Sequence, residues 1–287
     1  MTLTTTVLIT LLNDKRVGRT LRSLATQTRR PDCVLVADGG STDGTLDVIA
    51  ALREELAELR MEVKHLPGSV AATRAAALPL IATDVLVFLD SDQVAPDDWL
   101  EHLVAPLETP ATCSDAVAFT GGPTRPLGPP DGPGEAYLND FEAWFYPNVV
   151  AHDMSKVPMG NTAWRTRVLR DVGGFDTRLA WGGEDYDINV RVSLAGHRGH
   201  YVPAAWVYHD QAGRNDLRRL LRRKYRYNVG ATMAYRKNGV LRAKTRAAAA
   251  NTAAFSHPYE RWNLLVQPFA LVRGLLAWER VKRGRSP

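Results

Sequence analysis

The chain has 287 residues, 45% of them hydrophobic and 23% charged, which is typical of a globular protein with ample apolar material for a core. Its two cysteines, Cys33 and Cys113, exclude a disulfide framework and a zinc site, so we expect buried thiols in a reducing compartment. The net charge of +5 is unevenly distributed along the chain. Residues 214–287 hold 18 lysines and arginines against 3 acids, whereas residues 1–213 hold 18 lysines and arginines against 28 acids. The basic C-terminal region favours a negatively charged partner.

The first 108 residues alternate strands with helices. Apolar runs predict strands within residues 4–14, 32–40, 61–68 and 84–92, and helical spacing with capping signals predicts helices within 18–28, 41–60, 69–81 and 95–108. The first apolar run, from Val7, has no basic residues before it and no cleavage site after it, so we expect a strand of a cytoplasmic protein rather than a signal peptide. Continuous apolar strands indicate a parallel sheet that is covered by helices on both faces.

The middle of the chain is less regular. Residues 121–135 are rich in proline and glycine, which predicts a loop or lid. A helix is predicted to follow Glu184 and Asp185, and a final strand is predicted within residues 199–210, where it ends at His209.

Two further segments of the basic C-terminal region have helical character. Residues 215–239 predict a basic amphipathic helix. Residues 262–278 are apolar, but Pro268 and Arg273 interrupt them and they fall short of the roughly 20 clean apolar residues of a spanning helix. Together with the basic end of the chain, they fit attachment to an anionic membrane surface, or else a docked or oligomer-forming helix.

Polar clusters follow the buried strands. Since ligands bind beyond the carboxyl ends of such strands, Asp38 and the Asp90-Ser91-Asp92 cluster should face one crevice. Asp38 could accept a hydrogen bond from a nucleobase, and the paired carboxylates could grip one hard divalent cation. His209 could complete a manganese-type site if the fold brings it near Asp92. Each of these signals also fits a solvated strand end or a structural hydrogen bond.

The stretch "AWGGEDYDINVR", Ala180–Arg191, concentrates acids beside two glycines. Carboxylates are favoured at a helix start by the helix dipole, so any one of them has a purely structural explanation. Asp187 and Arg191 have the spacing of a helix ion pair. The glycines could let the backbone approach a ligand. The local sequence does not separate Glu184 from Asp185 as a chemically active group.

Eight short motifs occur in order within residues 5–210, namely "VLITLLN", "SLATQT", "DGGSTDGT", "FLDSD", "GNTAW", "GGFD", "GGEDYD" and "WVYHD". The ordered set resembles the inverting nucleotide-sugar glycosyltransferases of family 2. That resemblance implies the GT-A fold, an α/β architecture with a Rossmann-like, mixed but mostly parallel sheet flanked by helices. Two departures from the family pattern are Gly39, in place of a second Asp, and Ala75, in place of the Asn that usually follows the arginine at position 74.

The resemblance also implies roles for the residues that match the motifs. Asp185 would be the catalytic base, with Glu184 as its rival. The other implied sites are a nucleotide site of Asn13, Asp38, Arg74 and Asp90, a metal site of Asp90, Asp92 and His209, and a donor-sugar and acceptor site of Gly160, Asn161, Trp181 and Glu184.

By the same resemblance, the chain is expected to be a metal-dependent enzyme, with Mn or Mg, that moves a sugar from a nucleotide-diphosphate donor, preferentially a UDP-sugar, to a hydroxyl acceptor. That acceptor would be a glycan, a lipid-linked or cell-envelope glycan, or a small molecule. We expect a catalytic domain at 1–213, with a nucleotide-binding half at 1–120 and an acceptor half at 121–213, and a basic helical extension at 214–287.

The basic helix of the extension would pack on the catalytic domain, meet the donor diphosphate, or place the protein peripherally at the inner face of the cell membrane. Two alternatives to the enzyme are a non-catalytic protein that binds nucleotide-sugars or anionic lipids and a sugar-phosphate nucleotidylyltransferase. The latter would need a glycine-rich loop where "LLNDKRVGRTL" stands. No nucleic-acid partner is expected, since no recognisable module with interleaved aromatics accompanies the basic residues.

Overall fold

A computed structural model describes residues 2–108, 117–241, 243 and 255–286. Within these residues, a seven-stranded sheet has the order β3 (Met61–His65), β2 (Cys33–Asp38), β1 (Thr5–Leu11), β4 (Val85–Leu89), β8 (Asn161–Arg165), β6 (Val117–Gly121) and β9 (Arg198–Tyr201). The strands pair in parallel except where β8 runs antiparallel to both of its neighbours. The predicted mixed, mostly parallel sheet is therefore confirmed.

Alternation along the central strands divides the core into two layers. Val7 and Ile9 of β1 pack against α1 (Val17–Ala25), α2 (Thr45–Ala51) and α4 (Trp99–Glu108). Leu8 points the other way, into a layer that includes α3 (Val70–Ala77), α6 (Thr166–Asp171) and α7 (Glu184–Leu194). Because both faces of the sheet are covered at its centre, β1 and β4 are buried along nearly their whole length, as their continuous apolar runs predict.

A second sheet within the described residues holds β5 (Gln93–Val94), β10 (Val207–His209) and β7 (Thr124–Pro126). Two predictions need correction here. Residues 121–135, expected to be a loop, contain β7 and the start of α5 (Pro133–Phe145). The single strand expected within 199–210 is two strands, β9 in the large sheet and β10 in the small one, because the chain turns between Tyr201 and Val207.

Other local predictions also differ in detail. The helix predicted for residues 41–60 ends at Ala51 and continues only as turns. Cys33, expected to be buried, is half-buried at the start of β2, and Cys113 lies outside the described residues.

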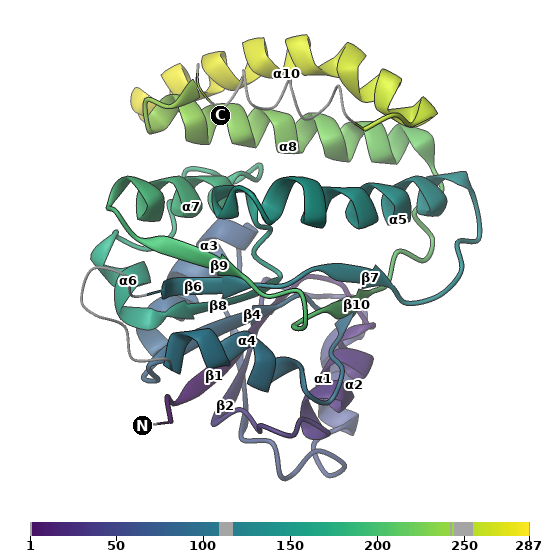
Figure 1. The fold of residues 1–287 in the computed structure, drawn as a ribbon, viewed down its shortest axis with the longest axis vertical. Helices are drawn as coiled ribbons and strands as arrows, with labels where there is room; N and C mark the ends of the chain where they lie inside the picture. The colour runs from purple at the N-terminus through teal and green to yellow at the C-terminus, as the bar shows by residue number, and fades with distance from the viewer. Residues whose placement is uncertain (1, 109–116, 242, 244–254, 287) are drawn as a thin grey trace.

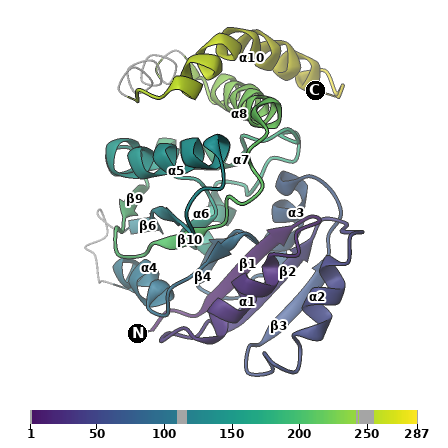
Figure 2. The ribbon, with the colours of Figure 1, turned by 90° about the vertical axis from the view of Figure 1, so that its right-hand side faces the viewer.

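The C-terminal region forms a pair of long helices, α8 (Leu217–Lys237) and α10 (Pro258–Lys282). Figures 1 and 2 show α10 as the outermost layer, α8 beneath it, and α5 with α7 between α8 and the large sheet. The side chain of Asp216 caps α8 by accepting from the backbone N–H groups of Arg218 and Arg219, which confirms the predicted helix and fixes its start. Since α8 lies over α7, its residues reach the carboxyl edge of the sheet.

Candidate active site

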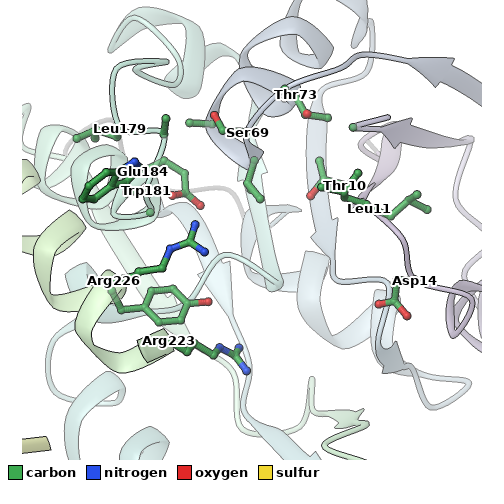
Figure 3. A pocket seen from close by; sticks show the side chains of 18 of the residues that line it. Thr10, Leu11, Asp14, Ser69, Thr73, Leu179, Trp181, Glu184, Arg223 and Arg226 are labelled. Atoms are coloured by element: carbon green, nitrogen blue, oxygen red, sulfur yellow. The ribbon is translucent and has the colours of Figure 1, made fainter. Parts of the chain in front are cut away.

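A cavity of about 590 Å³ lies between the carboxyl edge of the large sheet, the start of α7 and one face of α8. Figure 3 shows side chains from these elements pointing into it. Two predicted site residues, Trp181 and Glu184, line it directly, while several others are chain neighbours of lining residues such as Gly39, Thr73 and Ser91. The predicted crevice at the strand ends is therefore present, and α8 closes its far side.

Asp38 and Asn13 are chain neighbours of the residues Gly39, Leu12 and Asp14, which line the sheet side of this cavity. Asp38 ends β2 and is buried, and its carboxylate accepts from the Ser41 backbone N–H at 2.9 Å and lies 3.0 Å from the His65 ring. Burial opposes ionisation, but the hydrogen bonds with Ser41 and His65 hold the pKa of Asp38 below its ordinary value. Asn13 adopts a left-handed backbone conformation with φ of 54°, and its side chain accepts from the Thr42 N–H at 2.8 Å. Both residues therefore order the turn after β2.

Arg74 links the sheet side to α7. It is buried on α3, donates to Glu184 Oε1 at 3.0 Å, and lies 3.5 Å from Asp90 Oδ1. Its guanidinium also sits over the Phe88 ring, 5.5 Å from the centroid. Arg74 is thus an internal counter-charge that joins two acids from distant parts of the chain.

Gly160 makes room for Asp90. A Cβ atom at position 160 would lie 2.1 Å from Asp90 Oδ2, so the carboxylate occupies the space that any side chain there would need. The Asp90 N–H also donates to the Gly160 carbonyl at 3.2 Å. Desolvation raises the pKa of Asp90, Arg74 opposes that shift, and the negative charge of Asp92 adds to it.

Asp92 and His209 are brought together by the pairing of β10 with β5, as their predicted metal role requires. His209 Nε2 lies 3.4 Å from Asp92 Oδ2, and His209 Nδ1 lies 2.8 Å from Glu142 Oε1. Arg214 also donates to Asp92 Oδ2, at 2.5 Å. Burial works against the charge on Asp92, but His209, Arg214 and Arg16 hold its pKa below the ordinary value. Burial likewise works against a charged imidazole, yet Asp92 and Glu142 raise the pKa of His209 to about 9.

The same pair fits a divalent cation in part. Among the described residues, no group of three or more His, Cys, Asp or Glu side chains is arranged to hold a metal ion. Asp92 and His209 supply one oxygen and one nitrogen ligand, and Glu142 fixes the imidazole through its other nitrogen, as carboxylates commonly do behind a metal-bound histidine. Two protein ligands suit an ion that also binds phosphate oxygens and water.

The start of α7 separates the two rival acids. Glu184 is buried and held in the ion pair with Arg74. Asp185 is half-buried, forms no ion pair with any described residue, and accepts from the Tyr186 N–H at 2.8 Å. Desolvation, reinforced by the negative charge of Glu184, raises the pKa of Asp185 to about 7. Asp185 is therefore the acid with the proton affinity of a base near neutral pH.

Asp187, two residues further on, is fully buried in a structural network. Its carboxylate accepts from Arg191 at 2.8 Å, Lys237 at 2.8 Å and Asn238 at 2.8 Å. The predicted helix pair between Asp187 and Arg191 is confirmed, and α8 contributes the two other partners. The network therefore fastens the end of α8 to α7.

The glycines of this stretch serve the packing of α8. Gly183 has φ of 88°, and a Cβ atom there would lie 2.4 Å from the Gly230 backbone. The expectation that both glycines let the backbone approach the sugar is corrected for Gly183, because α8 fills the space beside it. Trp181, which lines the cavity, lies under the Arg273 guanidinium of α10, 5.0 Å from the ring centroid.

Asn161 is built into the scaffold beside the cavity. Its side chain accepts from Trp99 at 2.8 Å and donates to the carbonyl oxygens of Pro123 and Ala205 at 3.1 and 2.9 Å. Because these bonds occupy the buried amide, Asn161 is suited to positioning Gly160 and the β8 edge rather than to contacting a sugar with its side chain.

Two features of the site are not indicated by the sequence: Arg214 pairs with Asp92, and Glu142 orients His209. The arginines of α8 also line the cavity, and contact of this basic helix with the donor diphosphate is one of the alternatives that the sequence predicts. Glu142 and Arg214 carry no local pattern that distinguishes them from surface residues.

Comparisons with known proteins concern the family and the fold of the chain. Residues 4–230 match the family model described as "Glycosyltransferase like family 2". The pre-mycofactocin glycosyltransferase of Mycobacterium tuberculosis is 33% identical over 221 residues, covering 74% of this chain and 44% of that protein. Validoxylamine A glucosyltransferase of Streptomyces hygroscopicus subsp. limoneus is 29% identical over 215 residues, covering 66% of this chain and 48% of that protein. The chain thus spans about half the length of these curated relatives.

Among solved structures, the mannosyltransferase PcManGT from Pyrobaculum calidifontis, in complex with GDP-Man and Mn²⁺, superimposes with a TM-score of 0.68. The superposition covers 98% of this chain and 88% of the mannosyltransferase chain. Because the two sequences are only 18% identical, the likeness concerns the fold. With a family model that spans most of the sequence and a GT-A neighbour that spans nearly all of it, the chain belongs to glycosyltransferase family 2.

Proposed function

We propose that this protein is an inverting glycosyltransferase that moves a sugar from a nucleoside-diphosphate donor, preferentially a UDP-sugar, to a hydroxyl acceptor such as a glycan, a lipid-linked glycan or a small molecule. The observation that carries the proposal is the presence of two groups of acids next to residues that line the cavity, one at the strand ends and one at the start of α7. Asp38, Asp90 and Asp92 lie at the strand ends, and Asp185, whose pKa is about 7, lies at the start of α7.

In this proposal Asp185 takes the proton of the acceptor hydroxyl as that oxygen attacks the anomeric carbon. Glu184 is unsuited to this task because its carboxylate already serves Arg74. Asp38 accepts an N–H of the nucleobase, with Asn13 ordering the adjoining turn, and Arg74 and Asp90 face the ribose and diphosphate. Gly160 and Asn161 hold Asp90 in place, and Trp181 offers the sugar an apolar face.

A divalent metal, Mn or Mg, would be held by Asp92 and His209 with Asp90 nearby. When bound, it supplies positive charge that offsets the charge on the departing diphosphate. Arg214 contacts the same Asp92 oxygen, so this arginine and the metal are alternative counter-charges for one carboxylate. The solved neighbour with GDP-Man and Mn²⁺ supports a metal-assisted donor site in this fold.

No feature of the described residues specifically favours the two alternatives to the enzyme, a non-catalytic binding protein and a nucleotidylyltransferase. A protein that only binds nucleotide-sugars would not need a carboxyl group with a pKa near 7 beside the cavity. The turn after β1 holds Asn13 and Asp14 rather than the glycine-rich loop of a nucleotidylyltransferase.

We expect one nucleoside diphosphate to raise the melting temperature of the protein, and Mn or Mg to enlarge that increase, because binding to the folded state stabilises it by mass action. A panel of UDP, GDP, dTDP, ADP and CDP in a thermal-shift assay, with and without metal, identifies the donor base. Asp38→Asn should abolish most of the shift, whereas Asp43→Asn, an exposed acid at the end of the same turn, should leave it intact. Absence of a shift with every diphosphate would contradict the proposal.

We also propose that residues 214–287 are an extension that attaches the protein peripherally to an anionic membrane, such as the inner face of the cell membrane. None of the described helices is long and apolar enough to cross a membrane. The inner face of α10 includes the small residues Ala270, Gly274 and Ala277 beside the larger Trp278 and Val281, and a Cβ atom on Gly274 would lie 2.6 Å from Thr232 of α8. Several other large side chains of α10 lie exposed on the opposite face.

The outward face of α10 is apolar and has cations at both ends. Its large side chains are 51% to 72% exposed and recur at spacings of three and four residues, at Trp262, Leu265, Phe269, Val272 and Leu276. Exposed cations flank them, Arg261 at one end and Arg280, Lys282 and Arg283 at the other. Two copies joined along this face would bring like charges together, whereas an anionic lipid surface satisfies both the apolar face and its ends.

The double variant Phe269→Ser/Leu276→Ser should lose binding to vesicles of phosphatidylglycerol and phosphatidylcholine in a flotation assay. Both side chains are exposed, so the fold should be unaffected. Leu194→Ser, which removes an equally exposed leucine from α7, is the matched control and should still float. Wild-type protein that stays off the vesicles at low salt, or that forms a dimer broken by the double variant, would contradict membrane attachment.

A further inference from the structure

The cavity carries more positive charge than its own acids balance. Two acids line it, Asp14 and Glu184, and α8 contributes four arginines, Arg219, Arg222, Arg223 and Arg226. Figure 3 shows Arg226 reaching in on the same side as Trp181 and Glu184, with Arg223 further from them. This wall of the cavity is therefore strongly cationic.

The lining acids are already paired with other residues. Glu184 is bound by Arg74 at 3.0 Å, and Asp14 is bound by Arg16 at 2.7 Å. Arg219 lies 3.4 Å from Asp216, an exposed partner one turn earlier. In the part of the chain that the structure describes, no carboxylate lies within ion-pairing distance of Arg222, Arg223 or Arg226.

The donor does not account for all of this charge. A sugar diphosphate carries two negative charges, and the divalent metal that Asp92 and His209 would hold offsets them. On the sheet side, Arg214 and Arg16 already form ion pairs with Asp92. Arg223 lies further from Trp181 and Glu184 than Arg226 does (Figure 3), so we assign it to the diphosphate. Arg222 and Arg226 remain, one helical turn apart on the same face of α8.

We propose that Arg222 and Arg226 form a binding site for an anionic group, a phosphate or a carboxylate, on the acceptor. This inference rests on the proposed function and specifies its acceptor as a molecule with a negative charge near the hydroxyl that is glycosylated. Guanidinium groups bind such anions through two parallel hydrogen bonds, which gives orientation as well as affinity. Since both arginines come from the wall that also reaches Trp181 and Glu184, an anion held there would direct the rest of the acceptor toward Asp185.

Inorganic phosphate is a suitable probe once the nucleotide site is saturated. With Mg²⁺ and the nucleoside diphosphate that stabilises the protein, isothermal titration should show one phosphate bound in addition to the nucleotide. Arg222→Gln/Arg226→Gln should weaken that phosphate about tenfold or more and leave nucleotide affinity unchanged. Arg218→Gln/Arg236→Gln removes the same charge from exposed positions of α8 outside the cavity and should leave both affinities unchanged.

Three outcomes would overturn the inference: phosphate that binds only in competition with the nucleotide, phosphate binding that survives the cavity double variant, and equal weakening by the control double variant. If the cavity double variant loses vesicle binding and keeps phosphate binding, its arginines serve the lipid surface and the inference also fails. Absence of nucleotide binding would refute the proposed function alone, because phosphate can still be titrated into the free protein to test the anion site.

Discussion

Asp185→Asn should lower kcat by about 10² to 10⁴, the contribution of a positioned general base. The carboxamide has nearly the same shape but cannot accept the acceptor proton. Nucleotide affinity should stay unchanged, because the proposed nucleotide-binding groups, Asp38, Asp90 and Asp92, belong to the strand ends and not to α7. Steady-state kinetics with the donor identified by thermal shift, together with direct titration of the nucleotide, separate these two effects.

The pH dependence gives a second signature of Asp185. Its pKa is about 7, so kcat for the wild type should rise as pH increases through that value and the base becomes ionised. A carboxyl whose folded pKa is raised contributes stability that is present below its unfolded pKa and is lost as pH rises through the folded value. Asp185→Asn should therefore be at least as stable as wild type at pH 8. Near-normal kcat in the folded variant would refute the assignment.

Asp187→Ala should cost about 3–5 kcal/mol of unfolding free energy, the typical result of removing one partner from a buried ion pair. Its carboxylate is fully buried, and its loss removes the counter-charge of Arg191 and leaves Lys237 with Asp176 alone. Urea unfolding at pH 7.5 measures the change.

The matched control for Asp187 is Asp171→Ala. Asp171 also forms an ion pair with a residue four positions away, Arg167, at 3.8 Å, but both side chains of this pair are mostly exposed. Exposed pairs of this kind contribute about 0–1 kcal/mol, so the control should unfold nearly as wild type does. Equal losses in the two variants would show that the Asp187 network does not fasten α8 to α7.

The strand pattern and the order of the motifs predicted most of the fold. Continuous apolar runs around Val7, Val34 and Val87 indicated buried strands, and the acids after them lie at one edge of the sheet. The division of residues 199–210 into two strands could not be predicted, because the pairing of β10 with β5 and β7 depends on contacts with segments far away in the sequence.

The sequence indicates candidate positions for the site, which stay predictions, but it does not indicate how their side chains interact. Nothing within the stretch 180–191 distinguishes Glu184 from Asp185; the distinction comes from Arg74, a residue 110 positions away, which takes up Glu184. The role of Gly183 likewise depends on Gly230, which packs against it from α8. Long-range partners of this kind leave no periodic or local signal in the sequence.

The stereochemistry of the transferred sugar tests the central claim most directly. With the donor that stabilises the protein, an α-linked nucleotide-sugar can be incubated with enzyme alone and its slow hydrolysis followed by proton NMR before the free sugar mutarotates. A single displacement assisted by Asp185 predicts that the β anomer appears first and that its rate falls in Asp185→Asn. Initial release of the α anomer would contradict the account, as would absence of turnover in a protein that binds the nucleotide.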